Sequence, residues 1–356
     1  MGKILSFLKD SRYNILECGR INLDFDRFTE YKESAEHKSE RLFEYPTLQK
    51  KKIVPSSPYA SSIFAFFLDG SRRTYKIADY ITPDGRYLPI VAGQIGVAVL
   101  KREYSTGDLR VLRDYSRIES LIVFPDQGTN ENELRELAEA IKKISKRSFT
   151  VTRYNLKKEK EPVDLAIAKI TSMMHNLELK TVSDLTANSL LSPGEMLVLD
   201  GSLEFRKKID IVQFRNIVGL SKSFRPSSSL VKGKQKCDVG ALVSSLQRRE
   251  RTPVYLTTVE NNKIGMWYLR IRETKYMSNP LQGVLKLECF AVDPDEQENG
   301  LHSDRVDTIS ENVLRERNVT PYGSDLRWAN HIYPIYLAEN YIKSCFMSDV
   351  VFEGLF

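Results

Sequence analysis

Two aspartates in this sequence each follow a long apolar run and open the same tripeptide, Asp-Gly-Ser. The first copy ends "IFAFFLDGS" at residues 63–71, and the second ends "EMLVLDGS" at residues 195–202. An apolar run of this length that stops at a glycine is typical of a buried strand that enters a loop. We therefore expect Asp69 and Asp200 at the ends of two strands, where open α/β sheets usually carry ligand sites.

Asp-Gly-Ser also has an ordinary explanation, because Asp-Gly and Gly-Ser are favoured turn dipeptides. Two copies after equally apolar strands favour a shared purpose over two unrelated turns. Two carboxylates at neighbouring strand ends repel each other unless a cation lies between them. Since hard oxygen ligands select Mg²⁺ or Mn²⁺, one of these ions is expected at Asp69 and Asp200.

A third carboxylate is expected from a helix that packs over the strand ends. Residues 163–191 have a helical pattern, lead directly to the second strand and contain Glu178 and Asp184. Glu178 lies among apolar residues, which fits either a site at the edge of the core or an ordinary surface acid. His175 shares its helical face and either orients a ligand or fills a structural role. Three such acids can hold two metal ions for in-line attack on a phosphodiester.

The surrounding elements predict a mixed α/β protein built around one sheet. Strands are expected at 63–71, 87–104, 120–126, 195–202, 214–222, 254–260, 264–273 and 283–292, and helices at 130–147, 163–191, 241–250 and 333–346. Residues 1–58 are rich in charge and have a helical pattern over 25–44, which predicts an N-terminal helical arm. The remaining residues, 59–356, are expected to form the core domain.

Composition narrows the functional classes. The 356 residues carry a formal charge of +6, which permits a polyanionic partner without requiring one. The four cysteines form no CxxC pair and the four histidines no HExxH, so a zinc site is not expected. No segment approaches the roughly 20 apolar residues that span a bilayer, and no secretory leader is evident. We therefore expect a cytoplasmic protein without a membrane partner.

Five stretches occur in the order and approximate spacing of the NurA nuclease family, which this chain resembles over roughly residues 60–345. They are "FFLDGSRR", "LVLDGSLE", "NIVGLSKSF", "MWYLRIRE" with "GVLKLECF", and "YPIYLAENYIKS". The resemblance implies a ribonuclease-H-like fold with flanking helices, cleavage of DNA with Mn²⁺ or Mg²⁺, and a homodimer. It also implies a HerA-like hexameric ATPase as partner. Because the sequence has no GxxxxGK[ST] loop, ATP-driven translocation must come from that partner.

The resemblance also assigns roles to single residues. Asp69 resembles the catalytic, metal-binding aspartate of the family's first strand, and Asp200 the aspartate of its later strand. Glu178 resembles the helical glutamate that precedes that later strand. Lys222, in "GLSKS", corresponds to a lysine after a glycine-containing strand and is expected to contact a phosphate of DNA.

The closing helix departs from the family pattern. Members tend to place a histidine or aspartate after "YPxPLxxA", whereas this chain continues "YPIYLAENYI" and offers Glu339, Asn340 or Tyr341. Glu339 is the expected substitute as fourth metal ligand, and His331 lies about one turn too early. A missing fourth ligand would weaken a second metal ion or abolish activity.

Basic residues near these positions are candidates for DNA binding. Arg72 and Arg73 follow the first Asp-Gly-Ser and either clamp a phosphate or balance the acids. The polar stretch "SFRPSSSLVKGKQK" brings Arg225, Lys232 and Lys234, which track a DNA backbone or form an ordinary solvated loop.

These observations leave several functions open. The first is a metal-dependent DNA nuclease that degrades or resects DNA in repair or phage defence. The second, motivated by the irregular closing helix, is a catalytically inactive nuclease-fold subunit for DNA binding or assembly. An actin-like or sugar-kinase fold also places Asp and Gly at strand ends, but neither aspartate has the Asp-x-Gly pattern with a following threonine. An Argonaute-like nuclease lobe would use the same metal chemistry.

Overall fold

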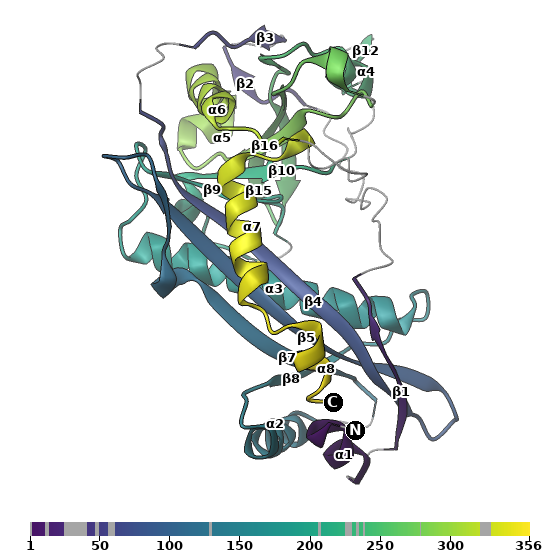
Figure 1. Cartoon of the computed structure of the whole chain (residues 1–356). Coiled ribbons are helices and arrows are strands. Elements are labelled where there is room, and N and C mark those ends of the chain that lie inside the picture. Colours follow the sequence, from purple (N-terminus) through teal and green to yellow (C-terminus); the bar gives the residue numbers. More distant parts are fainter. Residues whose placement is uncertain are drawn as a thin grey trace.

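One mixed sheet runs through the part of the chain that the computed structural model describes (Figure 1). The described residues are 2–10, 14–24, 41–46, 50–55, 61–127, 130–205, 208–224, 230–232, 235–237, 239–277, 279–320 and 329–356. Within them the strand order is β3-β13-β15-β16-β10-β9-β4-β5-β7-β8, and β1, β6 and β14 pair at the sides. The predicted mixed α/β architecture with helices around a sheet is therefore confirmed.

The centre of this sheet combines a meander with parallel strands. The antiparallel meander comprises β4 (Phe64–Ile81), β5 (Tyr87–Arg102) and β7 (Arg117–Pro125), with β6 (Leu109–Val111) on β5. Parallel neighbours are β8 (Thr150–Tyr154) on β7, β9 (Met196–Asp200) on β4 and β10 (Ile217–Ser221) on β9. Because β9 and β10 are parallel to β4, their carboxyl ends lie together beside the middle of β4. The expected strand end at Asp69 is wrong, because β4 continues to Ile81 and pairs Asp69 with Ala98 of β5. The second Asp-Gly-Ser does follow a strand end, since β9 ends at Asp200.

Antiparallel strands extend the sheet beyond β10. They are β16 (Val284–Phe290), β15 (Asn262–Arg270), β14 (Tyr255–Val259), β13 (Glu250–Arg251) and β3 (Lys51–Lys52). The predicted hairpin is present, because β14 and β15 pair through Val259 and Asn262. Glu260 and Asn261 between them have φ of 49° and 68°, the left-handed values that two-residue hairpin turns require.

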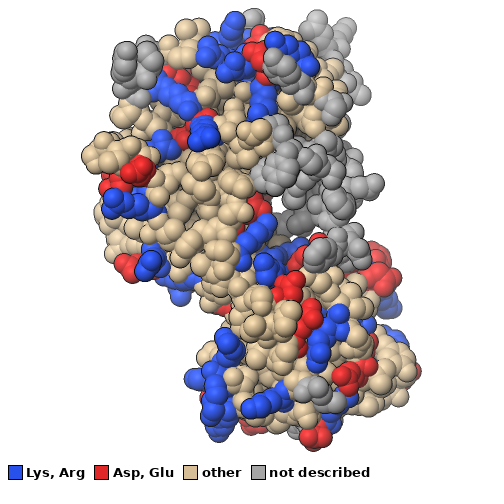
Figure 2. Space-filling model, viewed as in Figure 1, with Lys and Arg blue, Asp and Glu red and all other residues tan. Residues whose placement is uncertain are grey.

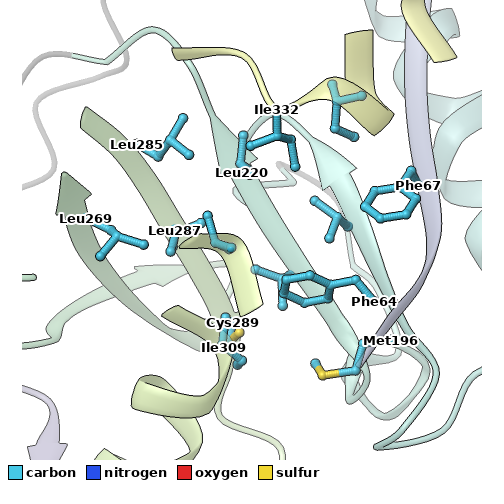
Figure 3. Packing of buried hydrophobic residues seen from close by; sticks show 14 of the residues in the cluster. Phe64, Phe67, Met196, Leu220, Leu269, Leu285, Leu287, Cys289, Ile309 and Ile332 are labelled. Carbon is cyan, nitrogen blue, oxygen red and sulfur yellow. The ribbon is translucent and has the colours of Figure 1, made fainter. Parts of the chain in front are cut away.

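Helices cover both faces of the sheet. Figure 1 shows α7 (Tyr333–Cys345) in front of β4 and β5 and the long α3 (Pro162–Ala187) behind them. On the α7 side, Phe67, Leu220 and Ile332 belong to one core cluster, part of which Figure 3 shows. On the α3 side, Phe66 and Leu68 pack with the helix in a second cluster. Alternation along β4 therefore turns residue 69 towards α7 and residue 70 towards α3.

Shorter helices and strands lie at the two ends of the molecule. At one end are α1 (Lys3–Asp10), α2 (Glu131–Ser145) and α8 (Asp349–Glu353). At the other are α4 (Val239–Ser244), α5 (Pro294–Asn299), α6 (Ser303–Arg315), β11 (Leu230–Lys232), β12 (Gln235–Cys237) and β17 (Leu301–His302). Single 3₁₀ turns are η1 (Arg113–Tyr115), η2 (Ile211–Phe214) and η3 (Thr274–Tyr276). Phe352 and Phe356 are fully buried beside α1, so the C-terminal tail completes this chain's own core.

The expected N-terminal helical arm is not evident in the described residues, and that expectation is corrected. β1 (Ile15–Asn22) pairs with the second half of β4, and β2 (Glu44–Tyr45) pairs with β17. β4 is long enough to run past β9, and β1 bonds the backbone groups that would otherwise form an open edge. Residues 25–40, most of the segment with the helical pattern, lie outside the described residues.

Several elements were not foreseen. Residues 293–300 were expected to be a loop but contain α5, whose first turn has a proline and two acids, a favourable helix start. Helix α6 and strand β8 were likewise missed. No helix among the described residues is long and apolar enough to cross a membrane.

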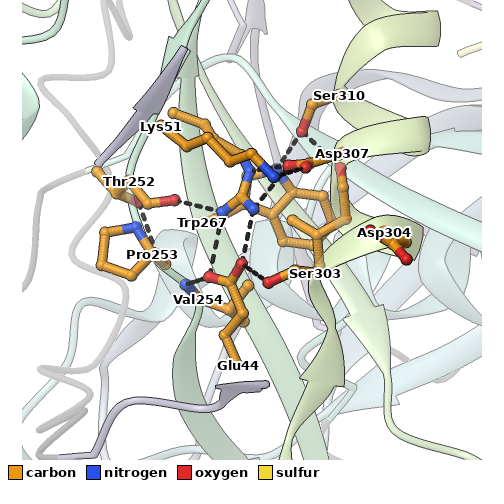
Figure 4. A network of polar contacts seen from close by, with 12 residues as sticks. Glu44, Lys51, Thr252, Pro253, Val254, Trp267, Ser303, Asp304, Asp307 and Ser310 are labelled. Carbon is orange, nitrogen blue, oxygen red and sulfur yellow. Dashed lines mark hydrogen bonds and ion pairs between the residues drawn. The ribbon is translucent and has the colours of Figure 1, made fainter. Parts of the chain in front are cut away.

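A buried ion network ties the N-terminal segment to the upper end of the sheet (Figure 4). The Arg251 guanidinium, from β13, has no exposed side-chain surface; its Nη2 lies 2.6 Å from Glu44 Oε1. Its Nε donates to Asp307 of α6 at 2.7 Å. Ser303 Oγ donates to Glu44 at 2.6 Å, and Lys51 also pairs with Asp307. Arg251 of β13 therefore links β2 and α6, two elements that are distant from it in the sequence.

Candidate functional site

The two aspartates of the repeated tripeptide lie side by side. Leu68 of β4 pairs with Leu199 of β9, so Asp69 and Asp200 follow at the same level of adjacent parallel strands. Asp69 is 3% exposed, and its burial together with the nearby Asp200 raises its pKa. The two aspartates are neighbours as expected, but only Asp200 lies at the end of its strand, whereas Asp69 lies within β4.

Two further charged groups reach this pair from the α7 side. Lys222 follows β10, and its Nζ lies 2.8 Å from Asp200 Oδ2. The same Nζ lies 3.4 Å from Glu339 Oε2 of α7. His331, before the helix, places Nε2 3.6 Å from the same Glu339 oxygen. The fold thus brings together Asp69, Asp200, Glu339 and Lys222, and it adds His331.

Glu178 lies on the opposite face of the sheet, beside Gly70. This side chain of α3 is 3% exposed, and its Oε2 lies 2.8 Å from Nδ1 of His175. A β-carbon on residue 70 would lie 2.0 Å from Glu178 Oε1, so the carboxylate occupies space that only glycine leaves open. Asp184, the other candidate acid of this helix, instead pairs with Arg117 at 2.5 Å.

The surroundings of these acids move their pKa values away from the usual range. Burial, and then the neighbouring Asp200, raise the pKa of Asp69 well above its usual value. Burial likewise raises the pKa of Glu178, with His175 acting against it. For Glu339, burial opposes ionisation, but Lys222 and Lys343 together lower its pKa to about 2. Acids with pKa values moved in opposite directions are typical of functional sites.

Two carboxylate oxygens in the cluster have no hydrogen-bond partner. They are Asp69 Oδ2 and Asp200 Oδ1, both buried. A buried acceptor without a partner costs free energy unless another group meets it. Hard, anionic oxygens of this kind suit Mg²⁺ or Mn²⁺, so the donor set fits a divalent cation.

The side chains are nevertheless not arranged as a complete metal site. Within the described residues, no group of three or more His, Cys, Asp or Glu side chains lies in a metal-holding arrangement. The Lys222 ammonium contacts Asp200 and Glu339 instead, so one position beside the acids already holds a positive charge. Ion binding would therefore need the carboxylates to move closer together.

The two arginines predicted to bind DNA have other partners. Arg72, on the α3 side, donates to Asp24 Oδ1 at 2.7 Å. Arg73, on the α7 side, donates to Asp349 and to the Met347 carbonyl, each at 3.2 Å. Both therefore connect β4 to flanking segments. Arg225, Lys234 and the side chain of Lys232 lie outside the described residues.

Charged residues of β16 were missed, although they support the second Asp-Gly-Ser turn. Glu288 is fully buried and accepts hydrogen bonds from Ser202 Oγ at 2.8 Å and the Leu203 amide at 2.6 Å. Lys286 Nζ lies 2.6 Å from Glu288 Oε1 and 3.4 Å from Glu204 Oε1. The pattern that points to them is a lysine and a glutamate two residues apart in the apolar strand "GVLKLECF".

Basic and acidic side chains are interspersed on the face of the molecule viewed in Figure 2. This distribution is typical of a solvated surface and does not by itself mark a path for DNA. A scan against protein-family models and a search of curated proteins both find no match to this chain. The interpretation of the site therefore rests on its geometry and on the sequence.

Gly70→Ala is expected to displace Glu178 and to lower any metal-dependent DNA cleavage by roughly 100-fold, because a misplacement of about 1 Å at a catalytic group can cost this much. Stability should change little, since the displaced group is the end of a flexible side chain. Initial cleavage rates and urea unfolding measure the two effects. Gly194→Ala is the matched control, because no atom lies within 4 Å of its added β-carbon. Wild-type cleavage by Gly70→Ala would contradict the role of this contact.

Proposed function

We propose that this chain is a metal-dependent DNA nuclease, a divergent member of the NurA family with a ribonuclease-H-like fold. One observation carries the proposal. Asp69 and Asp200 lie side by side where β9 ends against β4, Glu339 and Glu178 lie near them on the α7 and α3 faces, and one buried oxygen of each aspartate has no partner. Two adjacent buried carboxylates repel each other, and a divalent cation between them relieves that repulsion.

The residues of the cluster have separate tasks in this proposal. Asp69 and Asp200 offer the unpartnered oxygens that would hold the ion, and Glu178 completes the donor set from the α3 side. His175 fixes the orientation of Glu178 through its hydrogen bond. When bound, the ion activates water and stabilises the departing oxygen. Hydrolysis adds one water across a P–O bond of DNA and yields a phosphate monoester and a hydroxyl group.

The proposed substrate and partners rest on the resemblance to the NurA family and on the absence of a nucleotide-binding lysine loop from the sequence. The sheet order around β4 and β9, with helices on both faces, accords with a ribonuclease-H-like fold. The sequence has no nucleotide-binding lysine loop, so a HerA-like hexameric ATPase would deliver DNA to a homodimer of this chain in the cytoplasm. Either DNA repair or phage defence would use such a resecting activity.

The position of Lys222 favours a second candidate function. Its ammonium already pairs with Asp200 and Glu339, as it would in a nuclease-fold subunit that has lost its metal. Such a subunit would bind DNA or organise a complex without cleaving. The two candidates differ in one measurable property, namely metal-dependent hydrolysis.

The test is cleavage of end-labelled single- and double-stranded DNA with Mn²⁺, Mg²⁺ or EDTA, with and without a HerA-like ATPase. Wild-type protein is expected to cut with Mn²⁺ or Mg²⁺ and to stop in EDTA. Asp200→Asn should not cut under any of these conditions. DNA binding without cleavage in every condition would support the inactive subunit, and cleavage that survives Asp200→Asn would place the chemistry elsewhere.

A further inference from the structure

Lys222 is held in the acidic cluster by its backbone as well as by its charge. Its carbonyl accepts a hydrogen bond of 2.7 Å from Asn330 Nδ2, and Asn330 Oδ1 in turn accepts one from the Gly283 amide. These bonds tie the end of β10 to the segment before α7. The side chain is 13% exposed. Its position is therefore built into the fold.

The charge of this lysine is matched to the acids around it. The ammonium group faces the carboxylates of Asp200 and Glu339. The side chain is thus a permanent cation at any physiological pH. It contacts one oxygen of Asp200 and one of Glu339, at 2.8 Å and 3.4 Å.

The remaining acidic oxygens define a second, separate position. Asp200 binds Lys222 through Oδ2, whereas its Oδ1 has no partner. Asp69 Oδ2, on the neighbouring strand, also has none, and Asp69 is 3% exposed. Lys222 therefore neutralises Oδ2 of Asp200, whereas Oδ1 of Asp200 and Oδ2 of Asp69 are left without a partner. Two-metal sites commonly place one carboxylate between both ions.

We propose that the site binds a single divalent cation per chain, at Asp69 and Asp200, and that Lys222 Nζ takes the place of a second cation. Glu339 then serves as the partner of Lys222 rather than as the metal ligand that the sequence resemblance implies. The inference rests on the proposed nuclease function for its biological meaning, but it concerns ion binding and is testable without DNA.

Removing Lys222 should open the second position. Lys222→Met keeps a similar length but leaves Asp200 Oδ2 without its cation and removes one of the cations beside Glu339, so a second ion is expected to enter. Lys343 provides a matched control, because it also pairs with Glu339, at 2.6 Å, from a side chain that is 46% exposed. Lys343→Met should leave the number of bound ions unchanged.

The experiment is a titration of the full chain with Mn²⁺ alone, read by electron paramagnetic resonance and equilibrium dialysis. We expect one ion for wild type and Lys343→Met, two for Lys222→Met, and none for Asp69→Asn. Two ions or none in wild type would overturn the proposal, as would a single ion in a folded Lys222→Met variant. Circular dichroism checks that each variant is folded.

A second variant keeps the inference testable if Lys222→Met does not fold. Glu339→Gln retains the lysine, so it should still bind one ion with little change in affinity. A loss of affinity of about 10-fold or more, as for a group in the coordination shell, would overturn the proposal. One bound ion without DNA cleavage would instead refute only the nuclease function, and cleavage with two bound ions would refute only the single-ion inference.

Discussion

Asp69→Asn is expected to abolish metal-dependent DNA cleavage and, at the same time, to raise the thermal stability of the metal-free protein. Activity should fall by roughly 10³-fold or more, a loss comparable with that of other groups that stabilise transition-state charge. Stability should rise because the wild-type carboxylate is buried beside Asp200 with one oxygen unpartnered. An amide of the same shape removes that repulsion. Functional sites often cost stability in this way.

The stabilisation should depend on pH. Since burial and Asp200 raise the pKa of Asp69 above its usual value near 3.8, the folded state favours the protonated acid. The stability contributed by that proton is complete below pH 3.8 and is lost as the pH rises through the raised pKa. Thermal unfolding in EDTA should therefore separate wild type from Asp69→Asn more at neutral pH than in acid.

Asp79→Asn is the matched control for this prediction. Asp79 lies on the same strand and is also buried, but its carboxylate pairs with Lys76 at 2.8 Å. Its substitution should lower stability slightly or leave it unchanged, and cleavage should persist. Equal stabilisation by both substitutions would show that the effect does not arise from the cluster, and cleavage by Asp69→Asn would exclude this residue from the chemistry.

Arg251→Met is expected to destabilise the fold by about 3–5 kcal/mol, the usual range when one partner of a buried ion pair is removed. The substitution leaves Glu44, whose side chain has no exposed surface, without its cation. It also removes the donor that joins β13 to Asp307 of α6. Urea unfolding followed by circular dichroism measures the change.

Lys51→Met provides the comparison. Lys51 also pairs with Asp307, but its side chain is 40% exposed, so its removal should cost about 1 kcal/mol or less. A double variant, Arg251→Met with Glu44→Gln, should recover part of the loss, because the buried charge is gone. Equal losses of stability in Arg251→Met and Lys51→Met would contradict the prediction that the buried arginine holds the N-terminal segment in place.

The two proposals together describe an acidic cluster with a fixed internal cation. A lysine that pairs with Asp200 and Glu339 keeps these acids close to one another before an ion arrives. It also limits how many ions can enter. If a single ion is bound and DNA is cut, the lysine shares the electrostatic task that a second metal performs elsewhere.

The sequence determined much of this arrangement by itself. Long apolar runs before Asp-Gly-Ser predicted two buried strands, and their parallel pairing places Asp69 and Asp200 side by side. The predicted strand end was right for Asp200 but wrong for Asp69, because β4 continues to Ile81. The helical pattern before the second strand predicted the helix that carries Glu178. These are local patterns, in which residue spacing alone states which face is buried.

Other features were decided by the tertiary structure. The tripeptides are identical, yet Gly70 makes room for Glu178 whereas Gly201 has φ of 114° and open space around it. Sequence spacing did not predict that Lys222 would pair with Asp200, or that Glu288 would hold the turn after it. Each such contact joins residues that are distant along the chain. Local patterns specify burial and backbone conformation, but they do not specify which distant side chains meet, because packing of the whole sheet sets those distances.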